Sequence, residues 1–301
     1  MIANWKAHVA LLLVNLLYAA SHVIAKDVMP AYLSPNVFIL LRASGACLLF
    51  WLLFLSFSYQ KIATKDLLSL AVCGLFGVAI NQLFFFHGLN KSSAFNAGII
   101  MAFNPIIVLL LAYFILKDRI NARQLLGVLM GTSGAIMLTI SSFKDNSSYF
   151  IGDVFLIINS ISYALYLILA KPLMSKYRPL TVITWVFTFG LVFVLLFPPT
   201  LKETFATDFS AIPWRIIGII VYVIIGVTFL TYLLTMYGLK YLGPAIASSY
   251  IYVQPVMVIM FTLFFAWVNW TSMDASSSIT GVKIILMMLI FTGVYLSSSK
   301  K

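Results

Sequence analysis

The chain has 301 residues, of which 62% are hydrophobic and only 9% are charged, and its formal net charge is +11. A soluble domain is nearer half apolar and about a quarter charged, so this composition excludes a water-facing surface and requires lipid as the solvent. The basic residues are scattered singly over predicted loops, which argues against nucleic-acid binding, and two cysteines are too few for a disulfide framework or a cysteine metal site.

Ten apolar runs follow one another along the chain. A bilayer core is about 30 Å thick and a helix rises about 1.5 Å per residue, so one span needs about 20 apolar residues. Short linkers between the runs hold most of the charge. We therefore predict an all-α integral membrane protein with ten transmembrane helices. Their approximate limits are 8–25, 35–57, 67–87, 94–116, 123–141, 152–170, 180–198, 214–237, 244–267 and 280–297.

The first run has two interpretations. It follows Lys6 and passes through small residues near Ser21, which is also the pattern of a cleaved signal peptide. However, Asn15 and His22 interrupt it, and LLYAASHVIAK (16–26) aligns with ISYALYLILAK (161–171). We interpret the run as a retained span.

The basic residues predict the orientation. If the N-terminus is cytoplasmic, alternation places twelve lysines and arginines inside and six outside, with Arg42 within a span. This asymmetry follows the positive-inside rule. We predict a multi-pass protein of the cell (inner) membrane with both termini in the cytoplasm.

One phrase of the sequence occurs twice, 150 residues apart. HGLNKSSAFNAGIIMAFNPIIV (87–108) matches YGLKYLGPAIASSYIYVQPVMV (237–258), with Asn104-Pro105 aligned on Gln254-Pro255. The first, third and fourth runs thus match the sixth, eighth and ninth, which predicts two halves, 1–148 and 149–301. Because each half has five helices, the second enters the membrane from the opposite side. Such inverted-topology repeats around a central cavity are characteristic of secondary transporters; the alternative is a duplication kept only for packing.

The order of features in the first half resembles a known family. Residues 88–138 combine a helix rich in small residues with a mid-span proline, the pair Asp118-Arg119, and a helix with Gly127 and Gly134 seven apart. This order is similar to that of the EamA-like branch of the drug/metabolite transporter superfamily. The resemblance implies ten helices in two inverted repeats around a cavity, and transport of small metabolites, amino acids among them. Asp118 has no counterpart at the matched Val268, and we interpret it as an anchor of its helix end.

Several predicted spans carry polar residues, which are costly in hydrocarbon unless they are paired or line a cavity. They recur at spacings of 3, 4 and 7 on the first, sixth and eighth spans, so each set shares a helix face. We predict that these stripes face a common wet interior; hydrogen bonding between helices is the alternative. The candidate substrate-cavity residues are Asn15, Tyr18, His22, Arg42, Asn81, Gln82, Asn96, Asn104, Tyr163, Tyr166, Trp185, Thr231, Tyr250 and Gln254.

Two of these features point most directly to a substrate. Arg42 lies about seven positions into the second span, so ~10 Å below the outer interface. It either snorkels to the headgroups or binds a carboxylate or phosphate. Asn104-Pro105 and Gln254-Pro255 interrupt helices at matched depths, which points to a transporter's site or to packing kinks.

All eight acidic residues lie in loops or at span ends, so no mid-membrane carboxylate is available as an ion relay. This favours facilitated diffusion or exchange over proton coupling. No nucleophile–base pair indicates an enzyme, and no cofactor or metal is expected. We predict a carrier or exporter of small metabolites, most of all amino acids or similar amphipathic compounds, working by alternating access. The alternatives are a carrier of an anionic metabolite that uses Arg42, and a structural or regulatory protein. The expected partners are the substrate and the bilayer, with monomer or homodimer undecided.

Overall fold

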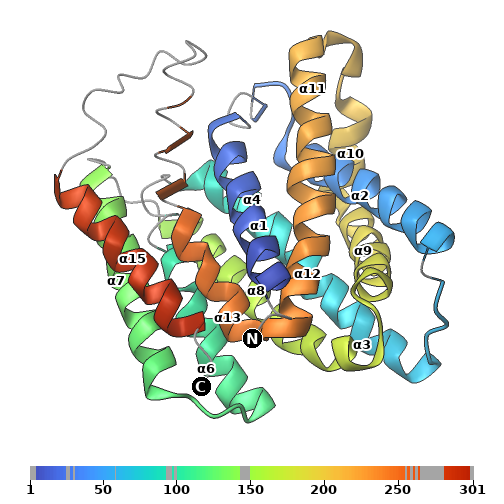
Figure 1. The fold of residues 1–301 in the computed structure, drawn as a ribbon. Helices are drawn as coiled ribbons and strands as arrows, with labels where there is room; N and C mark the ends of the chain where they lie inside the picture. Colours follow the sequence, from blue (N-terminus) through green and yellow to red (C-terminus); the bar gives the residue numbers. More distant parts are fainter. Residues whose placement is uncertain are drawn as a thin grey trace.

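The computed structural model describes residues 5–24, 28–29, 31–57, 59–92, 97, 100–142, 150–254, 256–257, 260–261, 264 and 281–298. All regular structure in these ranges is helical, which confirms the all-α class. In chain order the elements are α1 (Trp5–Ile24), α2 (Pro35–Phe57), α3 (Thr64–Gly74), π-helix η3 (Leu75–Ile80), α4 (Asn81–Lys91), α6 (Asn104–Leu116), α7 (Ala122–Ser142), α8 (Phe150–Lys176), α9 (Pro179–Leu196), α10 (Pro198–Ala206), 3₁₀-helix η4 (Phe209–Ala211), α11 (Trp214–Tyr222), π-helix η5 (Val223–Leu230), α12 (Thr231–Leu242), α13 (Pro244–Ser249), 3₁₀-helix η6 (Tyr250–Val253) and α15 (Gly281–Ser298) (Figure 1).

Five continuous helices in the described ranges are long and apolar enough to cross a membrane: Pro35–Phe57, Thr64–Lys91, Phe150–Lys176, Pro179–Leu196 and Trp214–Leu242. Four shorter apolar helices are Trp5–Ser21, Ile100–Leu116, Ala122–Leu138 and Ile284–Ser297. The predicted span 244–267 falls partly on residues outside the description, so the total of ten stays a prediction. The start of α1 and the end of α15 lie at the same end of the molecule, called the terminus-bearing end below (Figure 1).

Prolines and one glycine set several helix boundaries. Pro105 stands in the first turn of α6, where its missing N–H costs nothing, and a turn at Phe103 separates α6 from the helical residues before it. The predicted interruption is therefore present in the first half, whereas Pro255 lies outside the described residues. Gly243, at φ +82°, lets the chain turn from α12 into α13.

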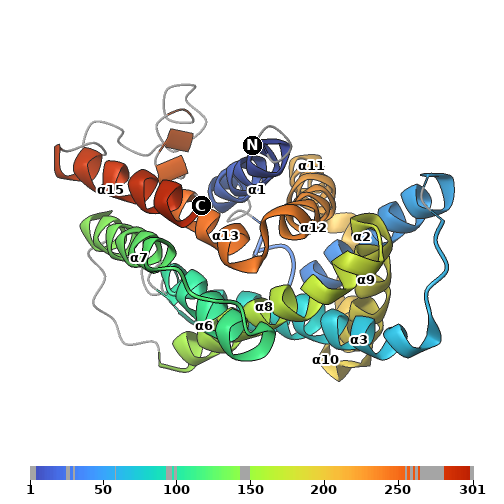
Figure 2. The same cartoon turned by 60° about the horizontal axis from the view of Figure 1, so that its bottom comes forward.

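Helix packing joins the two halves in matched pairs. In the first set, α4 packs along α8 and α3 along α9. With the halves exchanged, α12 packs along α1 and η5 along α2. Two further contacts, α2 with α9 and α7 with α15, each join a helix to its own counterpart in the other half. In Figure 2, α7 and α15 lie side by side at one edge of the molecule, and α2 and α9 lie at the other.

The contact between α7 and α15 is made by backbone. A Cβ atom on Gly293 would lie 2.5 Å from the backbone nitrogen of Gly131, and one on Gly127 would lie 2.7 Å from the carbonyl oxygen of Gly293. No side chain fits into either space. Gly127 and Gly131 therefore allow close helix approach, as their spacing predicts.

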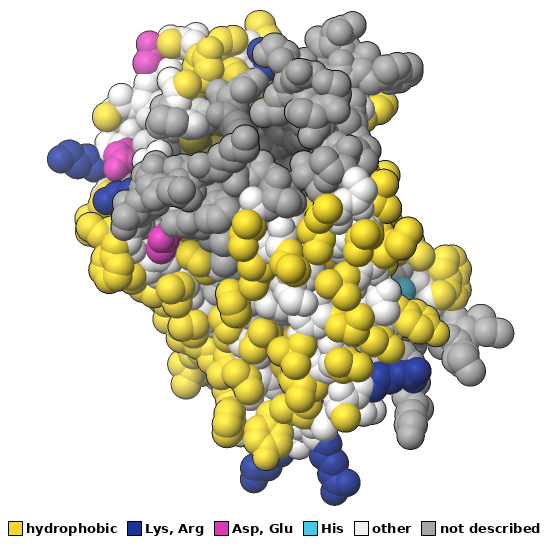
Figure 3. Space-filling view, turned by 90° about the vertical axis from the view of Figure 1, so that its left-hand side faces the viewer, with side chains coloured by type: hydrophobic (Ala, Val, Ile, Leu, Met, Phe, Trp, Pro, Cys, Tyr) yellow, Lys and Arg dark blue, Asp and Glu magenta, His cyan; other side chains and the backbone are white. Residues whose placement is uncertain are grey.

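The face formed by α6, α7 and α15 is apolar across its middle, with lysine or arginine toward its lower end (Figure 3). Large exposed side chains such as Phe114, Leu126 and Met288 cover it. A surface of this kind is suited to lipid rather than water.

Candidate substrate site between the two halves

Two π-helices occupy corresponding places in the chain. η3 begins at Leu75 within the helix 64–91, and η5 begins at Val223 within the helix 214–242. These are the third and eighth predicted spans, and the two starts are nearly 150 residues apart. A π-turn widens the helix and is frequent at functional sites. The sequence analysis missed this feature.

Carbonyl groups in and beside η3 accept hydrogen bonds from the second half. In a regular helix these carbonyls would bond only to the backbone four residues on. Side chains of α8 and α12 also reach them and so join the two halves. The bonds are Ser162 Oγ to the Phe76 carbonyl, Tyr232 Oη to Gly77 (3.1 Å) and Asn159 Nδ2 to Asn81 (2.8 Å).

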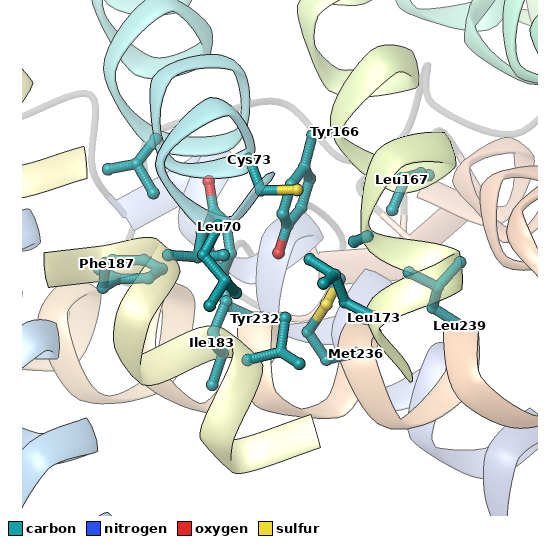
Figure 4. Packing of buried hydrophobic residues seen from close by; sticks show 14 of the residues in the cluster. Leu70, Cys73, Tyr166, Leu167, Leu173, Ile183, Phe187, Tyr232, Met236 and Leu239 are labelled. Atoms are coloured by element: carbon teal, nitrogen blue, oxygen red, sulfur yellow. The ribbon is translucent and has the colours of Figure 1, made fainter. Parts of the chain in front are cut away.

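Tyrosine rings surround these bonds. Tyr166 is fully buried, with its ring centroid 6.5 Å from that of Tyr163 and 6.4 Å from that of Tyr232. Figure 4 shows Tyr166 and Tyr232 within the apolar cluster, with the sulfur of Cys73 beside Tyr166. Gly77 makes room for this packing, because a Cβ there would lie 2.5 Å from the Tyr166 ring. The result is an aromatic interior with hydroxyl groups.

Arg42 points into this interior. Its side chain is 6% exposed, and its Nε donates a 2.9 Å hydrogen bond to Oγ1 of Thr228 on η5. The guanidinium carbon lies 4.8 Å from the ring centre of Phe86 and 5.6 Å from that of Phe38. The helix faces α4 and η5 here, and the side chain packs between them and away from the molecular surface, which favours the binding interpretation over snorkelling.

Several buried polar atoms in the described part of the chain have no hydrogen-bond partner. Burying such a group costs about 1–3 kcal/mol, so each needs an explanation. Neither amide atom of Gln82 has a partner at normal hydrogen-bond geometry, although the amide lies close enough to Tyr232 to interact with its hydroxyl group. An interior that binds a polar ligand requires such atoms. The others among the predicted residues are Asn104 Oδ1, Tyr166 Oη and Trp185 Nε1.

A second polar group lies further along α1. Gln254 Nε2 donates to Asn15 Oδ1 at 2.9 Å, and Asn15 Nδ2 donates to the Leu11 carbonyl at 2.7 Å. Tyr250 pairs with His8. These residues form hydrogen bonds with one another between helices. This is the arrangement expected if the polar residues serve helix packing instead of lining a cavity.

The described residues of the predicted site thus form two groups, with Trp185 and Asn104 apart from both. The set around the π-turns comprises Tyr18, Arg42, Asn81, Gln82, Tyr163, Tyr166 and Thr231, and the Thr231 and Tyr18 hydroxyl oxygens are 3.2 Å apart. Asn15, Tyr250 and Gln254 belong to the second group, while Trp185 stacks edge-on with Trp51 and Asn104 begins α6. The His22 side chain and Asn96 lie outside the described residues.

Tyr232 was missed by the sequence analysis although it is central to the site. It adjoins Thr231, and neighbouring residues on an α-helix point about 100° apart. Its spacing of four from Thr228 was the available signal, because residues four apart share a helix face.

Polar bonds also join the halves at both ends of the molecule. At the end that carries the chain termini, Lys171 Nζ lies 2.6 Å from Asp118, and Asp66 accepts from Lys176 Nζ and Tyr177 Oη, each at 2.8 Å. Asp118 therefore binds the other half in addition to ending its own helix. At the opposite end, Glu203 accepts bonds from Ser34 and Asn36, and Asp153 accepts one from Ser92.

A cavity of about 400 Å³ lies beside the Asp118–Lys171 pair. The loop between α6 and α7 and the connection 242–246 form most of its wall. The cavity is thus bounded by both halves at the terminus-bearing end.

A model of the EamA-like transporter family matches residues 5–140 and, separately, residues 150–299. The chain belongs to the EamA-like transporter family. The resemblance inferred from the order of motifs is confirmed. Membership also agrees with the apolar helices and with a carrier rather than an enzyme.

Members of this family from several organisms are similar along much of their length. An uncharacterized transporter of Archaeoglobus fulgidus is 26% identical, with 99% of each chain aligned. Uncharacterized transporter YyaM of Bacillus subtilis is 26% identical over 83% of this chain and 81% of its own. The "Probable terminal-alkyne amino-acid exporter" of Streptantibioticus cattleyicolor is 26% identical over 49% of each chain. One solved crystal structure, 18% identical, covers 97% of this chain and 96% of that one with a TM-score of 0.72, which shows a common fold.

In this EamA-like transporter, removing both ion pairs at the terminus-bearing end is expected to loosen that end. Ion pairs with a partly exposed lysine contribute little singly, so the double variant Asp66→Asn, Asp118→Asn is used. We expect a several-fold faster alkylation of the buried Cys73 by a maleimide, measured with Cys47→Ala as the background.

Asp208→Asn is the matched control, because Asp208 bonds to Ser210 within its own loop. Equal rates in the control and the double variant would show that the pairs do not hold the halves together.

Proposed function

We propose that this protein is a multi-pass carrier of the cell membrane that moves small amphipathic metabolites, most of all amino acids, by alternating access. The two halves, 1–148 and 149–301, act as inverted five-helix repeats, and both termini are cytoplasmic. One observation supports this above the others: at each of the two matched π-turns a side chain from the other half forms a hydrogen bond, Tyr232 to Gly77 and Arg42 to Thr228, within a buried polar and aromatic region, and polar bonds join the halves at both ends. Breaking one set of end bonds at a time would expose the site to one side.

The exchange symmetry of the helix contacts supports the inverted repeat. The largest helix contacts between the halves either recur with the halves exchanged or join a helix to its own counterpart. Such an arrangement has two states of similar energy, one open to each face, as alternating access requires. The position of both termini at one end fits an even number of spans (Figure 1).

The chemistry of the site supports an amino acid as substrate. Arg42 can bind a carboxylate, Gln82 and Tyr166 offer unpartnered polar atoms, and the surrounding rings suit an apolar side chain. The relative named as an amino-acid exporter gives modest additional support. A phosphorylated or nucleotide-linked substrate is the second candidate. It would need several basic groups, and Arg42 is the single buried one among the described residues.

Counterflow in proteoliposomes tests the proposal. Purified protein is reconstituted with a labelled panel of amino acids, purines and sugar phosphates on one side and unlabelled compound on the other. We expect saturable exchange of amino acids. No flux of any compound, from protein shown to be folded by its unfolding transition, would contradict the proposal and favour a structural or regulatory role.

A further inference from the structure

We propose that the substrate's carboxylate supplies the countercharge that no described residue gives Arg42, and that this makes the carrier an exchanger rather than a uniporter. The inference rests on the proposed function, because it concerns the same site. It assigns Arg42 a role in both binding and coupling.

Within the described ranges, Arg42 has only neutral partners. Its Nε bonds to Thr228, its guanidinium stacks between two phenylalanine rings, and no carboxylate of the described residues pairs with it. The described acids are engaged elsewhere. Asp66 and Asp118 pair with lysines, Asp153 and Asp208 bind serines, and Glu203 binds Ser34 and Asn36.

The fold does not need this charge for its own hydrogen bonds. The Thr228 hydroxyl already donates to the carbonyl of Val223 at 2.9 Å, so it stays satisfied without Arg42. A buried cation that satisfies no other group is costly in a membrane protein and marks a functional site. The two amino groups of the guanidinium can therefore take a carboxylate bidentately.

This charge acts differently on the loaded and the empty carrier. When the site is open to either side, water solvates the guanidinium. Between the open states the site must close, and an empty site then holds a dehydrated cation with only a hydroxyl and two rings. A bound carboxylate removes most of that cost because the pair enters the closed state together. The loaded carrier should therefore cross faster than the empty one.

A zwitterion fits the site better than a plain anion. The side-chain oxygens of Gln82 and Tyr166 can accept from an ammonium group without any carboxylate. One arginine balances the single negative charge of a carboxylate, whereas a phosphate with two negative charges would leave one of them unbalanced. Electrostatics and hydrogen bonding thus both select a compound with one carboxylate and one amino group.

The experiment compares net efflux with exchange for one probe. Proteoliposomes are loaded with labelled L-phenylalanine, or with the best-transported amino acid of the panel. They are then diluted into buffer with or without the same unlabelled compound. We expect wild-type exchange to exceed net efflux by at least about tenfold. The carboxamide and the decarboxylated amine of the probe should not support exchange.

Arg42→Gln should bring the ratio of exchange to net efflux close to one and remove the preference for the carboxylate. Arg178→Gln removes an exposed positive charge at the start of α9 and should keep the wild-type ratio. Thr228→Val retains the charge without its hydrogen bond, so it should keep a ratio well above one even if binding weakens.

The outcomes separate the two proposals. Flux with a ratio near one in the wild type, or an unchanged ratio in folded Arg42→Gln, would overturn this inference and leave the carrier function standing. An absence of flux for every compound would overturn the carrier function itself and this inference with it.

Discussion

Gly74→Ala is expected to destabilise the protein by about 2–3 kcal/mol, although it adds a single methyl group. The new Cβ would lie 2.7 Å from the carbonyl oxygen of Val186 and 2.8 Å from the backbone nitrogen of Gly190. Neither backbone atom can move aside by a side-chain rotation, so α3 and α9 must separate. Because these helices belong to different halves, the strain acts on the contact that the site depends on. Thermal unfolding in detergent measures the effect.

Gly218→Ala provides the matched control. It makes the same substitution in α11, where the new Cβ would have no atom within 4 Å. We expect it to be neutral or stabilising by roughly 0.5–1 kcal/mol, because alanine favours a helix over glycine. Similar unfolding midpoints for the two variants would show that α3 and α9 are not in close contact.

Replacing Arg42 with methionine is expected to separate stability from transport. Methionine fills the space between Phe38 and Phe86, and Thr228 keeps its bond to Val223, so no polar group loses its only partner. Removing an unpaired buried charge should leave the unfolding free energy unchanged or raise it by about 1–2 kcal/mol. Transport should fall by about a hundredfold, as expected when one member of a buried charge pair is lost.

Unfolding midpoints and exchange rates of the same preparation check this prediction, with Arg178→Met as the exposed control. A marked loss of stability in Arg42→Met would show that the arginine serves the fold instead. Retained transport would show that the carboxylate is bound elsewhere.

The sequence predicted those features that depend on composition and spacing. The limits of α2, 35–57, are the predicted ones, because the lipid environment demands a continuous apolar run of that length. Of the residues in the polar stripes, Tyr18 and Thr231 lie within hydrogen-bond distance of each other across the halves. A search for runs of about 20 residues passed over α10, which has nine and begins at a proline pair.

Other features depend on tertiary contacts that a single segment does not encode. Residues 75–80, LFGVAI, are an ordinary apolar helix sequence. Their π-turn is accompanied by side chains from the other half that bond to its carbonyls. The direction of Arg42 was open for the same reason, since its depth allows either snorkelling or burial. The neighbouring Thr228 and Phe86 decide between them.

The glycine contact between α7 and α15 has a mechanical consequence. Each helix comes from a different half, and their backbones touch at Gly127, Gly131 and Gly293 along one edge of the molecule. Interlocked backbones resist sliding. If the two halves move against each other as the proposed alternating access requires, we expect this edge to act as a hinge. Rotation about it would separate the halves most at the opposite edge, which α2 and α9 form (Figure 2).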